Sequence, residues 1–189
     1  IIPILHNNFP MKLIVGLGNP GDEYILTRHN VGFSALLQLV EALELKNEFL
    51  LDKKINARMM RAKLGRQNIL MMMPQTFMND SGTAVQAAMS FYKLTLADLL
   101  VIHDDKDIPL GETRMQSSRG PAGHNGVRSI IEKLGTENFM RIRIGVSPRD
   151  QKIIDTADFV LGKFTKEETN ELKTIFNHVV SDVKTWLAS

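Results

Sequence analysis

The 189-residue sequence contains no cysteine. This absence excludes disulfides, thiolate nucleophiles and cysteine-ligated zinc or iron–sulfur sites, and it fits a reducing compartment. No apolar run approaches the roughly 20 residues that a transmembrane helix requires. Hydrophobic residues make up 43% of the chain and charged residues 23%, a composition typical of soluble globular proteins. The length is sufficient for one domain with a substantial core.

Two common catalytic patterns are also missing. The sequence has neither an HExxH motif nor EF-hand spacing, although His103, Asp104, Asp105 and His124 are of residue types that bind metals. It lacks the G-x-S-x-G pattern as well, and Ser81 falls in a predicted helix cap. The sequence therefore favours water over a serine hydroxyl as a nucleophile, and it offers a metal no recognised ligand spacing.

The net charge is only +2, but the charge is unevenly distributed. Residues 106–152 contain nine basic and five acidic residues, a net +4, so the rest of the chain carries −2. A basic segment suits an anionic partner such as a nucleic-acid backbone. A solvated surface of mixed charge explains the same pattern equally well.

The first ten residues lack the basic n-region and long apolar stretch of a signal peptide. Met11 is followed at once by the apolar residues 13–15. We therefore expect residues 1–10 to be an extension outside the fold, and residues 11–189 to form a single domain.

Strand and helix patterns alternate along this domain, which predicts an α/β fold. Short apolar or alternating runs predict strands over residues 12–15, 55–64, 68–73, 99–103, 112–116 and 141–146, the last with one wet face. Predicted helices follow Asn30, begin at Asp80 or Ser81, cover residues 127–134, and begin at the capping box Thr165-x-x-Glu168. Residues 148–156 form the expected mobile loop.

Four short motifs rich in asparagine, histidine and glycine follow apolar runs or occupy glycine turns. They are GLGNPG at residues 16–21, TRHN at 27–30, TFMNDSG at 76–82 and GHNG at 123–126. Side chains at such places can point into a cleft instead of filling a core. A fifth segment, VIHDD at 101–105, ends an apolar run in carboxylates.

The first motif also matches the dinucleotide fingerprint G-x-G-x-x-G. That fingerprint should open a helix and be followed, about 20 residues later, by an acidic residue at the end of a second strand. Here the helical pattern starts only near Asn30, and Glu41 and Glu44 lie inside it. A tight turn that places Asn19 beside a cleft is the preferred interpretation.

A base with an orienting carboxylate can be assembled from these motifs. His29 has an ordinary pKa of about 6.5, which suits a general base near neutral pH. Asp104, at the end of a predicted buried strand, could accept the imidazole N–H and fix its tautomer. Asn19, Asn79 and Asn125 offer neutral groups that can hold a carbonyl or stabilise an oxyanion, although turn and helix-cap roles would explain each one alone.

Together, the ordered motifs resemble the bacterial-type peptidyl-tRNA hydrolase family. RIRIG at 141–145 and FVLGK at 159–163 add to the match, which covers the chain from Met11 onward. The resemblance implies a monomeric, cytoplasmic enzyme that needs no metal or other cofactor, with a central mixed β-sheet flanked by helices. It implies hydrolysis of the ester between a peptide and the 3′ ribose of tRNA, which recycles tRNA after premature release from translation.

The resemblance also implies site roles. His29 would activate water, Asp104 would orient it, Asn79 would position water or substrate and help stabilise the oxyanion, and Asn19 would contact the peptide. The tRNA terminus or the adjoining peptide would meet several residues, and the phosphates would meet Arg143; the binding set is Tyr24, Phe77, Met78, Asn79, His124, Asn125 and Arg143.

Three positions depart from the family pattern. Gln116 replaces a residue that is often basic, so Arg114 or Arg119 would have to supply that phosphate contact. Pro121 and Ala122 stand where many members have glycine. A non-catalytic RNA-binding protein and a nicotinamide-dependent oxidoreductase remain the alternatives from other classes.

Overall fold

The structure is a computed structural model that describes residues 11–148 and 156–189. The predicted extension at residues 1–10 and most of the predicted loop at 148–156 lie outside the described residues.

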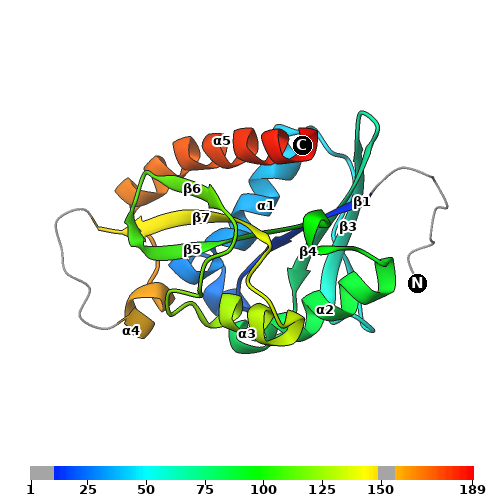
Figure 1. The fold of residues 1–189 in the computed structure, drawn as a ribbon. Helices are drawn as coiled ribbons and strands as arrows, with labels where there is room; N and C mark the ends of the chain where they lie inside the picture. The colour runs from blue at the N-terminus through cyan, green and yellow to red at the C-terminus, as the bar shows by residue number, and fades with distance from the viewer. Residues whose placement is uncertain (1–10, 149–155) are drawn as a thin grey trace.

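A seven-stranded mixed sheet forms the centre of the molecule, in the order β2-β3-β4-β1-β5-β7-β6 (Figure 1). Its strands are β1 (Met11–Gly16), β2 (Leu50–Asp52), β3 (Ala57–Leu64), β4 (Gln67–Pro74), β5 (Leu99–Pro109), β6 (Thr113–Gln116) and β7 (Met140–Ser147). The four inner strands β4, β1, β5 and β7 are parallel, whereas β3, β2 and β6 pair antiparallel at the two sides. The predicted single-domain α/β class with a mixed sheet is confirmed.

Helices cover both faces of this sheet. One layer contains α1 (Val31–Ala42) and α5 (Lys166–Ala188); the other contains α2 (Ser81–Tyr92) and α3 (Asn125–Leu134), and the short α4 (Thr156–Leu161) lies at the end of the sheet near β5 and β7 (Figure 1). The strands serve both cores by alternation: Ile14 packs with α1 and α5, while Leu13 and Val15 pack with α2 and α3. Parallel strands buried on both faces explain the continuous apolar runs of the sequence.

Local signals set the helix ends largely as predicted. The capping box at the start of α5 is present, since Thr165 and Glu168 exchange side-chain-to-backbone hydrogen bonds. Gly135 ends α3 in the left-handed conformation at φ 70°. The Thr27–Asn30 segment is tighter than predicted, because the 3₁₀ turn η2 (Arg28–Asn30) precedes α1.

The fingerprint-like motif does not open a helix of the kind that binds dinucleotides. After β1 the chain enters only a three-residue 3₁₀ turn, η1 (Asp22–Tyr24), and α1 begins at Val31. The nicotinamide hypothesis therefore loses the structural context that it requires.

The prediction of a wet face on β7 is wrong. Its arginines are buried, Arg141 with 1% and Arg143 with 2% of its surface exposed. The guanidinium of Arg141 donates to the carbonyls of Arg119 and Gly120, and Arg143 pairs with Asp105. These internal partners replace water, so the basic-apolar alternation does not mark a solvent-facing strand.

Polar residues also concealed the full length of β5. This strand continues through the carboxylates to Pro109, with an irregularity in its pairing after Asp105. The short strand β2, the helix α4 and the 3₁₀ turns were not predicted. Within the described ranges, no helix has the length and apolar content that a membrane span requires.

The strand order creates a crevice at the carboxyl end of β1. Connections from β1 lead through α1 to β4 on one side, and the chain then returns through α2 to β5 on the other. Open α/β sheets bind ligands where the strand order reverses in this way. The fold therefore directs attention to the loops after β1, β4 and β5.

We predict that Gly82→Ala destabilises the fold. Gly82 lies where α2 crosses α3, its N–H donates to Ser129 Oγ at 3.0 Å, and an added Cβ would overlap the Ser129 carbonyl. Overpacking of this kind costs about 1–3 kcal/mol, measurable as a lower free energy of unfolding in urea. Gly120→Ala is the control, because its Cβ would meet nothing closer than Glu137 Oε2 at 4.0 Å. Equal stability of the two variants would contradict a tight crossing.

Candidate active site

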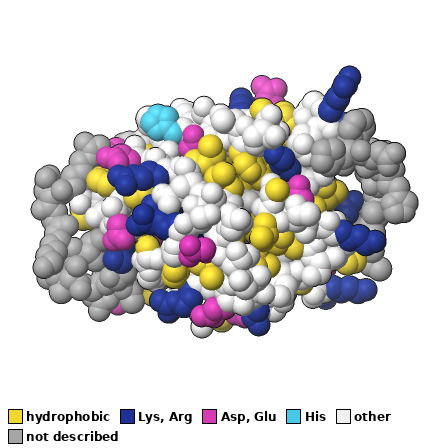
Figure 2. All heavy atoms as spheres, in the orientation of Figure 1, with side chains coloured by type: hydrophobic (Ala, Val, Ile, Leu, Met, Phe, Trp, Pro, Cys, Tyr) yellow, Lys and Arg dark blue, Asp and Glu magenta, His cyan; other side chains and the backbone are white. Residues whose placement is uncertain are grey.

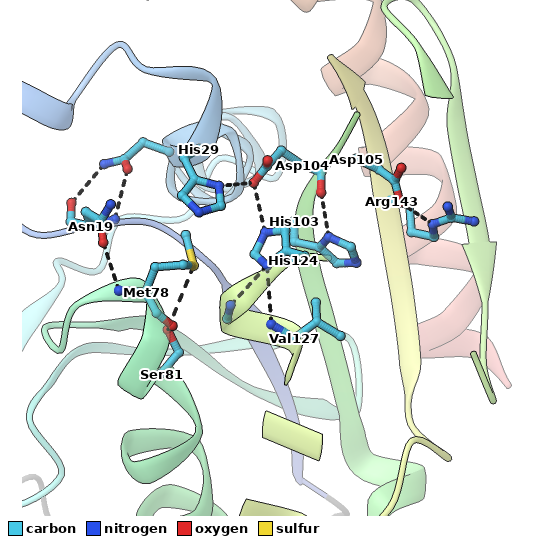
Figure 3. A network of polar contacts seen from close by, with 12 residues as sticks. Asn19, His29, Met78, Ser81, His103, Asp104, Asp105, His124, Val127 and Arg143 are labelled. Atoms are coloured by element: carbon cyan, nitrogen blue, oxygen red, sulfur yellow. Dashed lines mark hydrogen bonds and ion pairs between the residues drawn. The ribbon is translucent and has the colours of Figure 1, made fainter. Parts of the chain in front are cut away.

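Side chains from five segments meet at the carboxyl edge of the sheet (Figure 3). Two segments follow β1 and β4, one forms the turn η2, one is the middle of β5 and one begins α3. They contribute Asn19, Phe77, Asn79, His29, Asp104, His124 and Asn125. The structure therefore brings together most of the side chains that the sequence singled out.

One buried carboxylate oxygen links two imidazoles. Asp104 Oδ1 lies 2.8 Å from His29 Nδ1 and 2.9 Å from His124 Nε2. All three side chains are at least nine-tenths buried. The carboxylate accepts both contacts, so each imidazole carries its proton on the nitrogen that faces Asp104.

The other nitrogen of His124 confirms its tautomer. His124 is the N-cap of α3, and its Nδ1 accepts hydrogen bonds from the amides of Gly126 at 3.1 Å and Val127 at 3.2 Å. An Nδ1 that accepts two N–H groups carries no proton. His124 is thus a neutral Nε2–H donor that anchors Asp104 to the start of a helix.

The same carboxylate controls the protonation of His29. Burial of the imidazole lowers its pKa, but the charge of Asp104 and the hydrogen bond to it outweigh burial and raise the pKa of His29 above its usual 6.5. For Asp104, burial raises the pKa, but His124 and His29 together hold it well below its usual range. Asp104 is therefore ionised at all pH values near neutrality, and His29 Nδ1 donates to it.

His103 packs behind this group. Its ring lies 4.7 Å from the ring of His124 at an interplanar angle of 73°, and its Nδ1 donates to the Asp104 carbonyl at 2.7 Å. Burial lowers the pKa of His103 well below 6.5. His103 is accordingly neutral and supports the strand that presents Asp104.

Arg28 holds the turn that carries His29. Arg28 is not identified as a site residue from the sequence, because its only signal there is that it precedes His29. Arg28 donates to both carboxylate oxygens of Glu168, at 2.9 and 2.7 Å, and to the carbonyl of Lys163. Its guanidinium also stacks on Phe159, 4.5 Å from the ring centroid. Nη2 alone contacts both carboxylate oxygens, and this ion pair together with the stacking fixes the turn against the start of α5.

Asn19 and Asn30 form a second rigid network beside His29. The side chain of Asn30 accepts from the Asn19 amide and donates to the Asn19 carbonyl, both at 2.9 Å. Asn19 Oδ1 accepts from the Met78 amide at 2.8 Å. The Met78 N–H requires an acceptor, so this bond sets the orientation of the Asn19 side-chain amide. Its Nδ2 group points away from Met78 and keeps its two N–H donors.

Two open lobes meet around His29. The first lobe, a cavity of about 220 Å³, is lined by His29, Asp104, Asp105, Lys106, Ala122, Gly123, His124, Asn125 and Val160. The second lobe, also about 220 Å³, is lined by Asn19, His29, Phe77, Met78, Asn79, Asn125, Val160 and Leu161. His29, Asn125 and Val160 line both lobes. A substrate that spans both lobes would therefore pass over His29.

The predicted binding residues differ in their access to these lobes. Phe77, with 61% of its surface exposed, is accessible in the second lobe, as are Asn79 and Asn125. Met78 is 4% exposed and packs mainly in the core formed with α2 and α3. Tyr24 lies half-buried in η1 and is not among the described residues that line either lobe.

The interpretation of Arg143 as a phosphate contact requires correction. Its Nε lies 2.6 Å from Asp105 Oδ2 and its Nη1 lies 2.9 Å from Gln116 Oε1, inside the sheet. A guanidinium 2% exposed and already paired is not available to a phosphate in this structure. Gln116, which departs from the family pattern, is thus the neutral partner of this buried ion pair.

His29, Asp104 and His124 are of residue types that bind metal ions, and their potential ligand atoms lie within 4.8 Å of one another. However, each imidazole nitrogen that faces Asp104 donates a proton to it, and His124 Nδ1 accepts from two amides. Proton-mediated bonds therefore account for the arrangement of these three side chains.

The chain is similar to proteins of one family along almost its whole length. A family model described as Peptidyl-tRNA hydrolase matches residues 13–189. The peptidyl-tRNA hydrolase of Bdellovibrio bacteriovorus is 45% identical over 170 residues, covering 88% of this chain and 88% of that protein. That of Mesoplasma florum is 42% identical over 181 residues, covering 93% and 92%. The crystal structure of peptidyl-tRNA hydrolase from Acinetobacter baumannii superposes with a TM-score of 0.86 at 34% identity, covering 94% of this chain and 89% of that one.

We predict that Asp104→Asn lowers the pKa of His29 below 6.5, because burial of the ring remains while the negative charge is removed. Titration of the ring nitrogens by NMR measures this directly. Asp22→Asn, which neutralises an exposed carboxylate in η1, is the control and should leave the His29 titration unchanged.

The sign of the linked stability change follows from the raised pKa. The proton on His29 stabilises the fold fully below pH 6.5, and this contribution is lost as the pH rises through the folded-state pKa. Urea denaturation should therefore show a loss of stability over this window in the wild type that is absent in Asp104→Asn. An unchanged His29 pKa in Asp104→Asn would show that Asp104 does not control this imidazole.

Proposed function

The chain belongs to the peptidyl-tRNA hydrolase family of enzymes, and from this premise we propose that it cleaves the ester between peptide and tRNA with His29 as the general base. The observation that carries the proposal is the 2.8 Å contact between His29 Nδ1 and Asp104 Oδ1. This contact fixes the tautomer in which Nε2 is the free basic nitrogen, on a ring that lines both lobes.

The proposed reaction needs no covalent enzyme intermediate. His29 Nε2 takes a proton from a water molecule, and the water oxygen forms a bond to the ester carbonyl carbon. The tetrahedral intermediate then breaks its bond to the 3′ ribose oxygen of the tRNA, which receives the proton from His29. The products are a peptide with a free carboxylate and a tRNA with a free ribose hydroxyl.

Asp104 supports both proton transfers. Its charge stabilises the imidazolium that forms when His29 accepts the proton, and its position prevents the ring from rotating. The second hydrogen bond, from His124, keeps the buried carboxylate ionised and in place. Because an ester is an easily cleaved substrate, a positioned base and an oxyanion contact suffice for useful catalysis.

The asparagines supply neutral contacts on the side of the second lobe. Asn79 and Asn125 are exposed and line the second lobe together with His29, where an amide N–H can donate to the developing oxyanion. Asn19, whose Oδ1 is occupied by Met78, has its Nδ2 to donate to a carbonyl of the peptide. Such a contact beyond the ester would favour peptidyl over aminoacyl substrates.

Exposed basic side chains fit the tRNA part of the substrate. In Figure 2, Lys and Arg side chains, with some carboxylates between them, gather over the region where Figure 1 shows β5, β6 and β7. Arg114 and Arg119 are exposed in and after β6. We propose that these residues, instead of Arg143, meet phosphates. We also propose that the protein acts in the cytoplasm. We propose that it acts as a monomer, because the described residues of one chain supply all the catalytic groups named above.

Substrate selectivity and the role of His29 can be tested together. We expect hydrolysis of N-acetyl-aminoacyl-tRNA but not of unblocked aminoacyl-tRNA, with EDTA present throughout, and a loss of about 10²–10⁴-fold in His29→Ala. Measured release of acid-soluble label gives both rates. His178→Ala, which removes an exposed histidine on α5, is the matched control and should retain activity. Tight tRNA binding without hydrolysis by the wild type would instead favour a non-catalytic RNA-binding protein.

Asn79 offers a second test of the mechanism. If its amide stabilises the oxyanion, Asn79→Ala should lower kcat about 10²-fold while KM changes little, because the contact strengthens only in the transition state. Steady-state kinetics with N-acetyl-aminoacyl-tRNA provide the two constants. Asn177→Ala on the exposed face of α5 is the control. A rise in KM with unchanged kcat would assign Asn79 to ground-state binding instead.

A further inference from the structure

Lys106 is a cation in the site to which the proposed mechanism assigns no role. It lies on β5 two residues after Asp104, and both residues line the first lobe. Asp105, which lies between them, lines the same lobe, and the pairing of β5 with β7 becomes irregular after it. The ammonium group therefore belongs to the same crevice as the orienting carboxylate of the base.

The neighbouring carboxylates leave the charge of Lys106 largely available. Asp104 is held by His29 and His124, and Asp105 is held by Arg143. Among the described residues, the ion pair of Lys106 Nζ is with Asp107 Oδ1, at 3.2 Å, and these side chains are 32% and 49% exposed. An exposed pair of this kind contributes at most about 1 kcal/mol, so its ammonium can exchange partners readily.

The two lobes differ in their charged groups. The first contains the cation Lys106 beside Asp104 and Asp105, which have internal partners, whereas the described lining of the second contains no lysine, arginine or carboxylate. Among the described residues lining either lobe, Lys106 is the only lysine or arginine. The second lobe offers the amides of Asn19 and Asn79 beside the apolar Phe77. Near the ester, the peptide has neutral amides, whereas the nucleotide has a phosphodiester with one negative charge.

We propose that Lys106 binds the phosphodiester of the 3′-terminal nucleotide of tRNA in the first lobe, while the peptide occupies the second. This inference rests on the proposed function and adds the orientation of the substrate across His29. The contact is a charge-assisted hydrogen bond from ammonium to phosphate oxygen, and it would replace the exposed pair with Asp107. Lys106 thereby selects the nucleotide end and aligns the ester with the base.

The test compares the variants Lys106→Gln and Lys106→Arg with the control Lys184→Gln. Lys184 is an exposed residue of α5, in the helix layer that contains α1. Two substrates are used: N-acetyl-aminoacyl-tRNA, and the N-acetyl-aminoacyl ester of adenosine, which has no phosphate. For the tRNA substrate, Lys106→Gln should raise KM about tenfold with little change in kcat. The dependence of log kcat/KM on log salt should become shallower by about 0.7, the value for one contact with a single strand.

Three comparisons sharpen the result. Lys106→Arg should retain most of the affinity, Lys184→Gln should behave as wild type, and Lys106→Gln should cleave the phosphate-free ester at the wild-type rate. Equal losses on both substrates, or no loss on either, would overturn the phosphate contact. If the wild type cleaves neither substrate, the proposed function fails. Fluorescence anisotropy with deacylated tRNA then decides the Lys106 contact alone, because equal dissociation constants for wild type and Lys106→Gln would reject it.

Discussion

A carboxylate buried without hydrogen bonds would be protonated or would destabilise the fold. The candidate active site depends on the two hydrogen bonds that satisfy the buried carboxylate of Asp104. Asp104 Oδ1 accepts one hydrogen bond from His29 and one from His124. His29 lies in a turn after β1, and His124 is the N-cap of α3. The same two bonds that keep the carboxylate charged also draw three segments of the chain together. Position and protonation state are therefore determined by one oxygen atom.

The sheet gives this interaction a rigid base. Its inner parallel strands are buried on both faces, and their carboxyl ends present polar residues at one edge where the strand order reverses. Arg28 fastens the turn of His29 to α5, and Asn30 fastens Asn19 to that turn. Because strands, caps and ion pairs hold the chemical groups, little reorganisation is needed when a substrate enters.

The sequence was informative where periodicity or motif order carries the signal. The apolar runs located the buried strands, and the expectation that His29 meets Asp104 follows from two polar residues beside neighbouring strand ends. Single-sequence patterns could not show that Arg143 would find Asp105, 38 positions away, so its charge was assigned to solvent. Equally, nothing local shows that His124 would cap α3 with Nδ1, or that β5 would continue through Lys106 and Asp107. Arg141 and Arg143 have partners 21 and 38 positions away, which propensity does not encode. The partners of His124 Nδ1 are local, but histidine is not among the preferred N-cap residues.

The bond from Arg28 to Glu168 has a consequence for the order in which the site forms during synthesis of the protein. The two residues are 140 positions apart, and His29 and Asp104 are 75 apart. A contact cannot form before both partners have been synthesised, and a chain emerging from the ribosome folds as its later segments become available. The turn of His29 is therefore fastened only after Glu168 has been synthesised. Until then, the bond between Arg28 and Glu168 cannot hold the turn that presents the proposed base.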